Sequence, residues 1–195
     1  ESEVLQAHTK AALFDQSTLG KIRIEGSDTE TFLDRLCTNN MKRAPGQLVY
    51  TALLNARGTF EGDLIAMRLS NESYMIFVGT TSVKRDLAWL KNHLQPDEQV
   101  HLKDETELYA TLALAGPESS RAAMEVGARE LNELKYFHHT KTEIGGTSVL
   151  AMRVSFVGES GWELVFQTDR AESVAEVLLK AGAKPAGLFA QSSMR

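Results

Sequence analysis

The stretch QLVYTALLNARGTFEGDLIAMRLS, residues 47–70, carries the clearest strand and turn pattern in the sequence. Apolar runs stand on both sides of Asn55–Gly58, a segment typical of a tight connection between two antiparallel strands. A further turn at Asn71 and Glu72 leads into the apolar run at 73–79, which predicts a third strand. The pattern therefore indicates an antiparallel meander and not the regular strand and helix alternation of a parallel sheet.

The segment before this meander predicts a strand followed by a short helix. Residues 21–26 alternate polar and apolar side chains, as a half-buried strand does. Ser27 and Glu30 have the spacing of a capping box, and Phe32, Leu33 and Leu36 then recur at helical spacing. We expect this helix to end near residues 37–40.

The segment after the meander continues the mixed pattern. It predicts a helix over 82–94, an apolar strand over 108–117, a helix opened by Pro117, strands over 147–156 and 162–166 around a Gly158–Gly161 turn, and a last helix from Asp169 to Gly182. Strands come in hairpins with helices between them, so the expected class is α+β with antiparallel sheets and flanking helices. Without a Gly/Ser/Pro linker, residues 1–195 are expected to form one domain of closely packed subdomains.

Composition excludes several classes of protein. A hydrophobic content of 43% is ample for a core, and a formal net charge of −5 argues against nucleic acid or an anionic membrane as the main partner. The sequence has neither a membrane-spanning apolar run nor the pattern of a signal peptide. A single cysteine, Cys37, excludes an internal disulfide and indicates a reducing compartment, most simply the cytoplasm.

Common cofactor and metal motifs do not occur in the sequence. Neither a Gly-x-Gly-x-x-Gly fingerprint nor a Walker-type loop is present, so dinucleotide and nucleoside triphosphate binding are not supported. His138 and His139 are adjacent, but they have no further ligand at metal spacing, so no metal site is expected. Cys37 has no paired histidine signature and is interpreted as an inert buried thiol.

Two carboxylates stand in apolar strands and are the candidate chemical groups. Asp63 and Glu163 each follow a glycine by one or two positions and are followed by apolar residues. Burying an unpaired carboxylate costs several kcal/mol, so such a residue is solvent-facing, paired, or reserved for a ligand. The predicted hairpin lets the Tyr50 phenol meet Asp63. The alternative is that both acids are solvated strand ends.

Taken together, these segments resemble a known family. The stretches ALFDQSTLGKIRIEG, FLDRLCTNN, GQLVYTALLNARGTFEGDLIAMRL, LALAGPES and RVSFVGESGWEL are similar to the folate-binding aminomethyltransferase fold of the glycine cleavage T-protein. LCTNN and GESGWEL resemble most the branch attached to flavoprotein dimethylglycine and sarcosine dehydrogenases. The resemblance implies a ferredoxin-like subdomain and a chain that is part of a longer protein, whose C-terminal β-domain would follow Arg195.

The resemblance also implies a tetrahydrofolate site. The family places Tyr50, Asp63, Glu163 and Arg195 around the cofactor, and Phe156 stands where many members have a tyrosine. Glu163 would accept the ring N–H and the 2-amino group of the pterin in bidentate fashion. Asp63 would be the catalytic residue, accepting a proton and stabilising a developing iminium charge.

The implied function is one-carbon transfer to tetrahydrofolate, giving methylenetetrahydrofolate from an amine or imine donor. That donor would come from a flavin domain or from a lipoyl carrier protein. Gly62 stands where the T-protein often has a second aspartate, and this departure favours the flavoprotein branch. Two alternatives are a folate-binding iron–sulfur assembly factor, which GESGWEL argues against, and a non-catalytic binding module.

Overall fold

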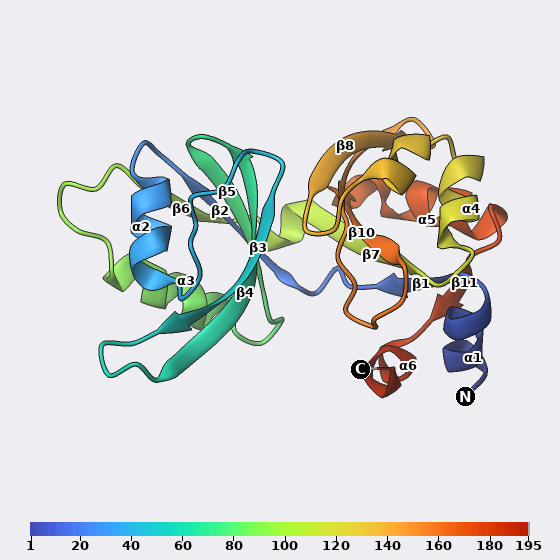
Figure 1. The fold of residues 1–195 in the computed structure, drawn as a ribbon, viewed down its shortest axis with the longest axis horizontal. Coiled ribbons are helices and arrows are strands. Elements are labelled where there is room, and N and C mark those ends of the chain that lie inside the picture. Colours follow the sequence, from blue (N-terminus) through green and yellow to red (C-terminus); the bar gives the residue numbers. More distant parts are fainter. Residues whose placement is uncertain (195) are drawn as a thin grey trace. The chain divides into compact units, whose positions relative to one another are not determined.

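The computed structural model describes residues 1–194, and the chain divides into two compact units. The first unit comprises Glu1–Thr18 and the chain from Glu107 onward, and the second comprises Leu19–Thr106. Each unit has its own sheet and its own hydrophobic core (Figure 1). That these units pack closely as one domain stays a prediction.

The first unit is built on a six-stranded sheet in the order β11-β1-β7-β10-β9-β8. Its strands are β1 (Ala12–Asp15), β7 (Tyr109–Ala115), β8 (His139–Ile144), β9 (Thr147–Met152), β10 (Gly161–Gln167) and β11 (Lys184–Ala186). Neighbouring strands are antiparallel, except that β1 and β11 run parallel. Its helices are α1 (Ser2–Thr9), α4 (Ser119–Glu125), α5 (Ala171–Lys180) and α6 (Leu188–Ser193), with short 3-10 turns η2 (Arg129–Glu133) and η3 (Thr168–Arg170).

The two faces of this sheet carry different side chains. On one face, Trp162, Leu164 and Phe166 of β10 pack in a core with residues of α4 and α5. Burial of each such side chain stabilises the fold by about 1.5 to 3 kcal/mol. The other face carries Phe14 and a group of small residues that pack with α1 and α6: Ala12, Ala113 and Ala115. Because these alanines are short, this face leaves room above the sheet.

The second unit is built on a five-stranded antiparallel sheet in the order β3-β4-β5-β2-β6. Its strands are β2 (Gly20–Glu25), β3 (Leu48–Leu54), β4 (Phe60–Ser70), β5 (Ser73–Val78) and β6 (His101–Asp104), and η1 (Thr106–Leu108) follows. Its helices are α2 (Thr29–Leu36) and α3 (Val83–Asn92), which bury Leu33 and Leu90 against the sheet. The predicted meander of β3, β4 and β5 and the α+β class are confirmed.

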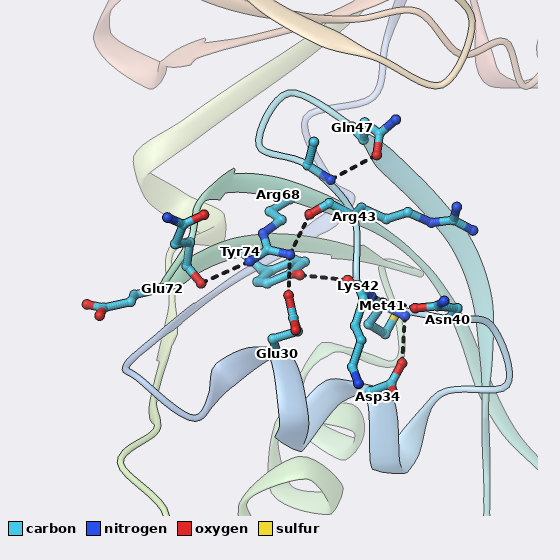
Figure 2. A network of polar contacts seen from close by, with 12 residues as sticks. Glu30, Asp34, Asn40, Met41, Lys42, Arg43, Gln47, Arg68, Glu72 and Tyr74 are labelled. Atoms are coloured by element: carbon cyan, nitrogen blue, oxygen red, sulfur yellow. Dashed lines mark hydrogen bonds and ion pairs between the residues drawn. The ribbon is translucent and has the colours of Figure 1, made fainter.

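A polar network fastens the loop between α2 and β3 to this sheet, as Figure 2 shows. The Arg68 guanidinium pairs with Glu30 of α2, donates to the Arg43 carbonyl and lies over the Tyr74 ring. The Tyr74 hydroxyl donates to the Met41 carbonyl at 2.8 Å. Because the Arg68 and Tyr74 side chains are buried, they hold the loop by interactions that water cannot easily replace.

Two local predictions were wrong. The residue before α2 is Asp28 and not Ser27, and no side chain caps this helix; Glu30 instead pairs with Arg68. The strand predicted over 147–156 ends at Met152, and Phe156 lies in the loop that follows. Within residues 1–194, no helix combines the length and the apolar character that crossing a membrane requires.

Candidate functional site

Tyr50 and Asp63 meet on the sheet of the second unit, as the predicted hairpin implied. Strands β3 and β4 are paired so that Ala52 lies opposite Asp63 and Tyr50 lies opposite Ile65. This register puts the two side chains diagonally across the strands, and the Tyr50 hydroxyl donates to Asp63 Oδ2 at 2.7 Å. Both side chains are exposed. The pair therefore presents a hydrogen-bonded carboxylate at an accessible surface.

The glycine before Asp63 lies against the N-terminal turn of α3. A Cβ on Gly62 would be 3.3 Å from Arg85 Nη2 and 3.5 Å from Asp86 Oδ1. The buried Asp86 carboxylate accepts from the Ser82 hydroxyl at 2.6 Å and pairs with Arg85 at 2.7 Å. An aspartate in place of Gly62 would put a second carboxylate beside Asp86, next to the Arg85 guanidinium with which Asp86 already pairs.

Glu163 of β10 lies in the first unit, on the face of the sheet that carries the small residues. Its neighbours across the strands are Ala113 and Met152, while Trp162 and Leu164 face the opposite core. Gly161 stands two residues before Glu163, where the backbone of β7 comes so close that a Cβ would be 2.0 Å from the Leu114 carbonyl oxygen. Only glycine fits there. Glu163 is only 6% exposed. The strand therefore holds a carboxylate away from water.

The Glu163 carboxylate has no hydrogen bond or ion pair to any residue in the described range 1–194. Burial raises the pKa of the Glu163 carboxyl from its ordinary value of 4.5 to about 7. The cause is desolvation, which disfavours the charged form. Such a group has unmet capacity to accept hydrogen bonds, as a ligand-binding carboxylate would.

A small hollow, partly open to solvent, lies at this carboxylate. Its lining comes from β1, β7, β10, α6 and the loop after β9: Phe14, Gln16, Ala113, Leu114, Ala115, Val154, Ser155, Phe156, Val157, Gly161, Trp162, Glu163 and Gln191. Phe156 is 47% exposed and lines the solvent side of the hollow. The hollow is thus largely apolar, with a few polar groups.

Two of those polar groups were not predicted from the sequence. Gln16 Oε1 and Ser155 Oγ are screened from solvent, and neither atom has a hydrogen-bond partner in the described part of the chain. Gln16 comes just after β1 and Ser155 comes just after β9, so residues far apart in the sequence meet here. Nothing in the sequence around Gln16 or Ser155 indicated that their side chains would line a hollow.

The predicted site residues therefore fall into two pairs. Tyr50 and Asp63 are hydrogen-bonded in the second unit, and Phe156 and Glu163 line one hollow in the first unit. Arg195 lies outside the described residues. Their roles in binding and catalysis stay predictions.

Other candidate groups show no such arrangement. Among residues 1–194, no group of three or more His, Cys, Asp or Glu side chains is placed to hold a metal ion. Burial raises the pKa of the Cys37 thiol to about 12, although the Thr51 hydroxyl opposes this effect. A thiol with so high a pKa stays protonated near neutral pH and is a weak nucleophile.

The two antiparallel-dominated sheets with flanking helices define an α+β protein, and its first unit holds a buried carboxylate at a hollow. The sequence pattern of the GCVT N-terminal domain family matches residues 1–195, and the chain belongs to this family. The resemblance predicted from the sequence is therefore confirmed.

Known proteins agree with this assignment. An aminomethyltransferase of Rubrobacter xylanophilus is 35% identical over 96% of this chain and 50% of its own length. The crystal structure of glycine cleavage system aminomethyltransferase T from Bartonella henselae matches with a TM-score of 0.89 and 26% identity, over 100% of this chain and 52% of that one. The chain spans about half the length of the curated relatives it matches.

A heterotetrameric sarcosine oxidase from Corynebacterium sp. U-96 also shares the fold. Its structure matches with a TM-score of 0.66 and 15% identity, over 92% of this chain and 89% of that one. At this identity the likeness concerns the fold alone. The flavoprotein branch therefore stays a prediction.

Proposed function

We propose that this chain is the folate-binding domain of a tetrahydrofolate-dependent one-carbon transferase of the aminomethyltransferase type. The observation that carries the proposal is the Glu163 carboxylate, which is buried in a hollow and has no partner among the described residues. A buried carboxylate is costly unless donors reach it. A pterin offers two parallel donors, its ring N–H and its 2-amino group, which one carboxylate accepts together.

The side chains that line the hollow suit a flat heterocycle in chemical character. Phe156 offers an exposed aromatic ring at its solvent side, and Phe14 and Val154 are apolar. Flat heterocycles pack well on aromatic and aliphatic surfaces while a few polar groups fix their orientation. Glu163 and Phe156 would therefore hold the pterin. Arg195 is a further proposed folate contact, on the resemblance alone.

Tetrahydrofolate supplies the nitrogens that take up the one-carbon unit. Asp63 would act near them as a proton acceptor and as a negative charge that stabilises developing positive charge. The Tyr50 hydroxyl donates to Asp63 Oδ2, which fixes the carboxylate and leaves Oδ1 to accept a proton. Tyr50 is thus proposed to orient the catalytic carboxylate as well as to contact folate.

The proposed product is methylenetetrahydrofolate, formed from an amine or imine donor. The names of the curated relatives support aminomethyl transfer. The donor would be delivered by a lipoyl carrier protein or by a flavin domain. A cytoplasmic location stays a prediction from the single cysteine, Cys37.

Calorimetric titration with tetrahydrofolate tests this proposal in the full-length protein. Wild type is expected to bind, and Glu163→Gln is expected to bind roughly 10 to 150 times more weakly, because an amide donor would face a ligand N–H. Glu143→Gln is the matched control, since Glu143 is exposed on β8 of the same unit. Failure of wild type to bind, or equal affinity in Glu163→Gln, would contradict the assignment.

A further inference from the structure

Three polar groups in the hollow have hydrogen-bonding capacity that the described residues do not satisfy. They are the Glu163 carboxylate, Gln16 Oε1 and Ser155 Oγ. A buried polar atom without a partner costs about 1 to 3 kcal/mol, so two such atoms grouped with a buried carboxylate around one hollow point to a ligand. A ligand that satisfies all three would remove this cost.

The backbone fixes Gln16 in this place. Its N–H donates to the Thr111 carbonyl of β7 at 2.9 Å, directly after β1 ends at Asp15. Gln16 is 7% exposed, and its side chain lines the hollow. The Oε1 atom of this carboxamide is screened from solvent and accepts no hydrogen bond from the described residues.

Ser155 reaches the hollow from a different segment. It stands between Val154 and Phe156 in the loop after β9, and both of these neighbours also line the hollow. A hydroxyl can donate or accept, so Ser155 adapts to either kind of ligand atom. The Gln16 carboxamide, in contrast, presents one donor and one acceptor side by side. It matches a ligand edge that carries an acceptor next to a donor.

Resting on the folate function proposed above, we propose that Gln16 and Ser155 contact the pterin and that Gln16 selects its reduced state. Once Glu163 has accepted the ring N–H and one amino hydrogen, the ring carbonyl is left on one flank and N1 with N8 on the other. In tetrahydropterin, N8 carries a hydrogen and N1 is an acceptor, which complements a carboxamide. In the fully oxidised ring both nitrogens are acceptors, so one of the two contacts to Gln16 is lost.

Titrations with two probes, tetrahydrofolate and folic acid, test this proposal in the full-length protein under reducing conditions. We expect wild type to prefer tetrahydrofolate by at least about tenfold. With folic acid one polar group of Gln16 stays unpaired, and such a loss weakens binding by about tenfold or more. Gln16→Met should weaken tetrahydrofolate binding about tenfold and bring the two affinities to within roughly threefold. Ser155→Ala should weaken both probes about equally, by roughly fivefold, because the proposed partner of the Ser155 hydroxyl is the ring carbonyl, which both probes carry.

Thr29→Val is the matched control, because the Thr29 hydroxyl is also buried without a partner in the described chain but lies at the start of α2 in the second unit. It should leave both affinities unchanged. Thermal unfolding of Gln16→Met should occur at the same temperature as wild type or higher, because an unpaired buried carboxamide is removed.

The results separate the proposed folate function from the proposed role of Gln16. If wild type binds tetrahydrofolate and Gln16→Met changes neither affinity, the role of Gln16 is refuted while the folate function stands. If Gln16→Met weakens both probes equally, selection of the reduced ring is refuted. If wild type binds neither probe, both the inference and the proposed function fail. Ser155→Ala is a smaller change, so it tests the Ser155 contact even if the Gln16→Met variant fails to fold.

Discussion

Replacing Glu163 by glutamine should stabilise the folded protein, and by an amount that depends on pH. The pKa of this carboxyl is about 7 in the fold and 4.5 when solvated, so the folded state binds a proton more tightly than the unfolded state does. The contribution of Glu163 to stability is therefore fully present below pH 4.5 and is lost as pH rises toward 7. At about 1.36 kcal/mol per pKa unit, the loss amounts to about 3 kcal/mol.

Urea denaturation of wild type and Glu163→Gln between pH 5 and pH 8 measures this effect. A Trp89→Phe background leaves Trp162 as the one tryptophan of residues 1–195, and Trp162 lies in the core of the unit that contains Glu163. At pH 8, Glu163→Gln should unfold with a free energy higher by up to about 3 kcal/mol, and the difference should shrink as pH falls to 5. Glu143→Gln, at an exposed position of the same unit, should follow wild type. Parallel curves for wild type and Glu163→Gln would refute the reasoning, since Glu163 would then be solvated or paired.

Three further predictions concern binding, turnover and packing. Tetrahydrofolate affinity should fall as pH drops below about 7, by up to about tenfold per pH unit, because protonated Glu163 cannot accept both donors. Calorimetric titration should show this fall in wild type and no such fall in Glu163→Gln. Asp63→Asn should lower kcat on the order of 100-fold while the Kd for tetrahydrofolate changes by less than about threefold, and steady-state kinetics with unchanged kcat would mark Asp63 as a solvated strand residue. Gly62→Asp should lower the free energy of unfolding by about 1 to 3 kcal/mol because its carboxylate would face Asp86, whereas Gly62→Ala should cost less; equal effects in urea denaturation would exclude charge repulsion.

The parts of the fold that the sequence predicted are those that short-range chemistry determines. The Asn55–Gly58 turn has its Asn55 N–H bonded to the Thr59 carbonyl and its Gly58 at a φ of 73°, as its residues indicated. The short edge pair β1 and β11 was not predicted, because it joins Ala12–Asp15 to Lys184–Ala186 and depends on contacts across the whole chain. Tertiary pairing also explains the failed capping box, since Glu30 binds Arg68 of β4.

The candidate site shows the same division. Tyr50 and Asp63 could be paired from one hairpin, because strand register places them diagonally. Glu163 was noticeable as an acid in an apolar strand, but its burial depends on the alanines of neighbouring strands. Gln16 and Ser155 gave no signal, because their significance comes only from being buried together in a hollow built from distant segments.

The insertion of Leu19–Thr106 between the two parts of the first unit affects how the chain is made. Strand β1 leaves the ribosome well before its partners, which are Tyr109–Ala115 and Lys184–Ala186. At about 5 to 20 residues per second, the nascent β1 waits roughly 5 to 20 s for the first partner and longer for the second. The strands of Leu19–Thr106 pair only with one another, so this segment can complete its core during that wait. Synthesis thus gives the hollow of Glu163 its last wall, Gln191 of α6, only after both parts of the first unit and the inserted second unit have been made.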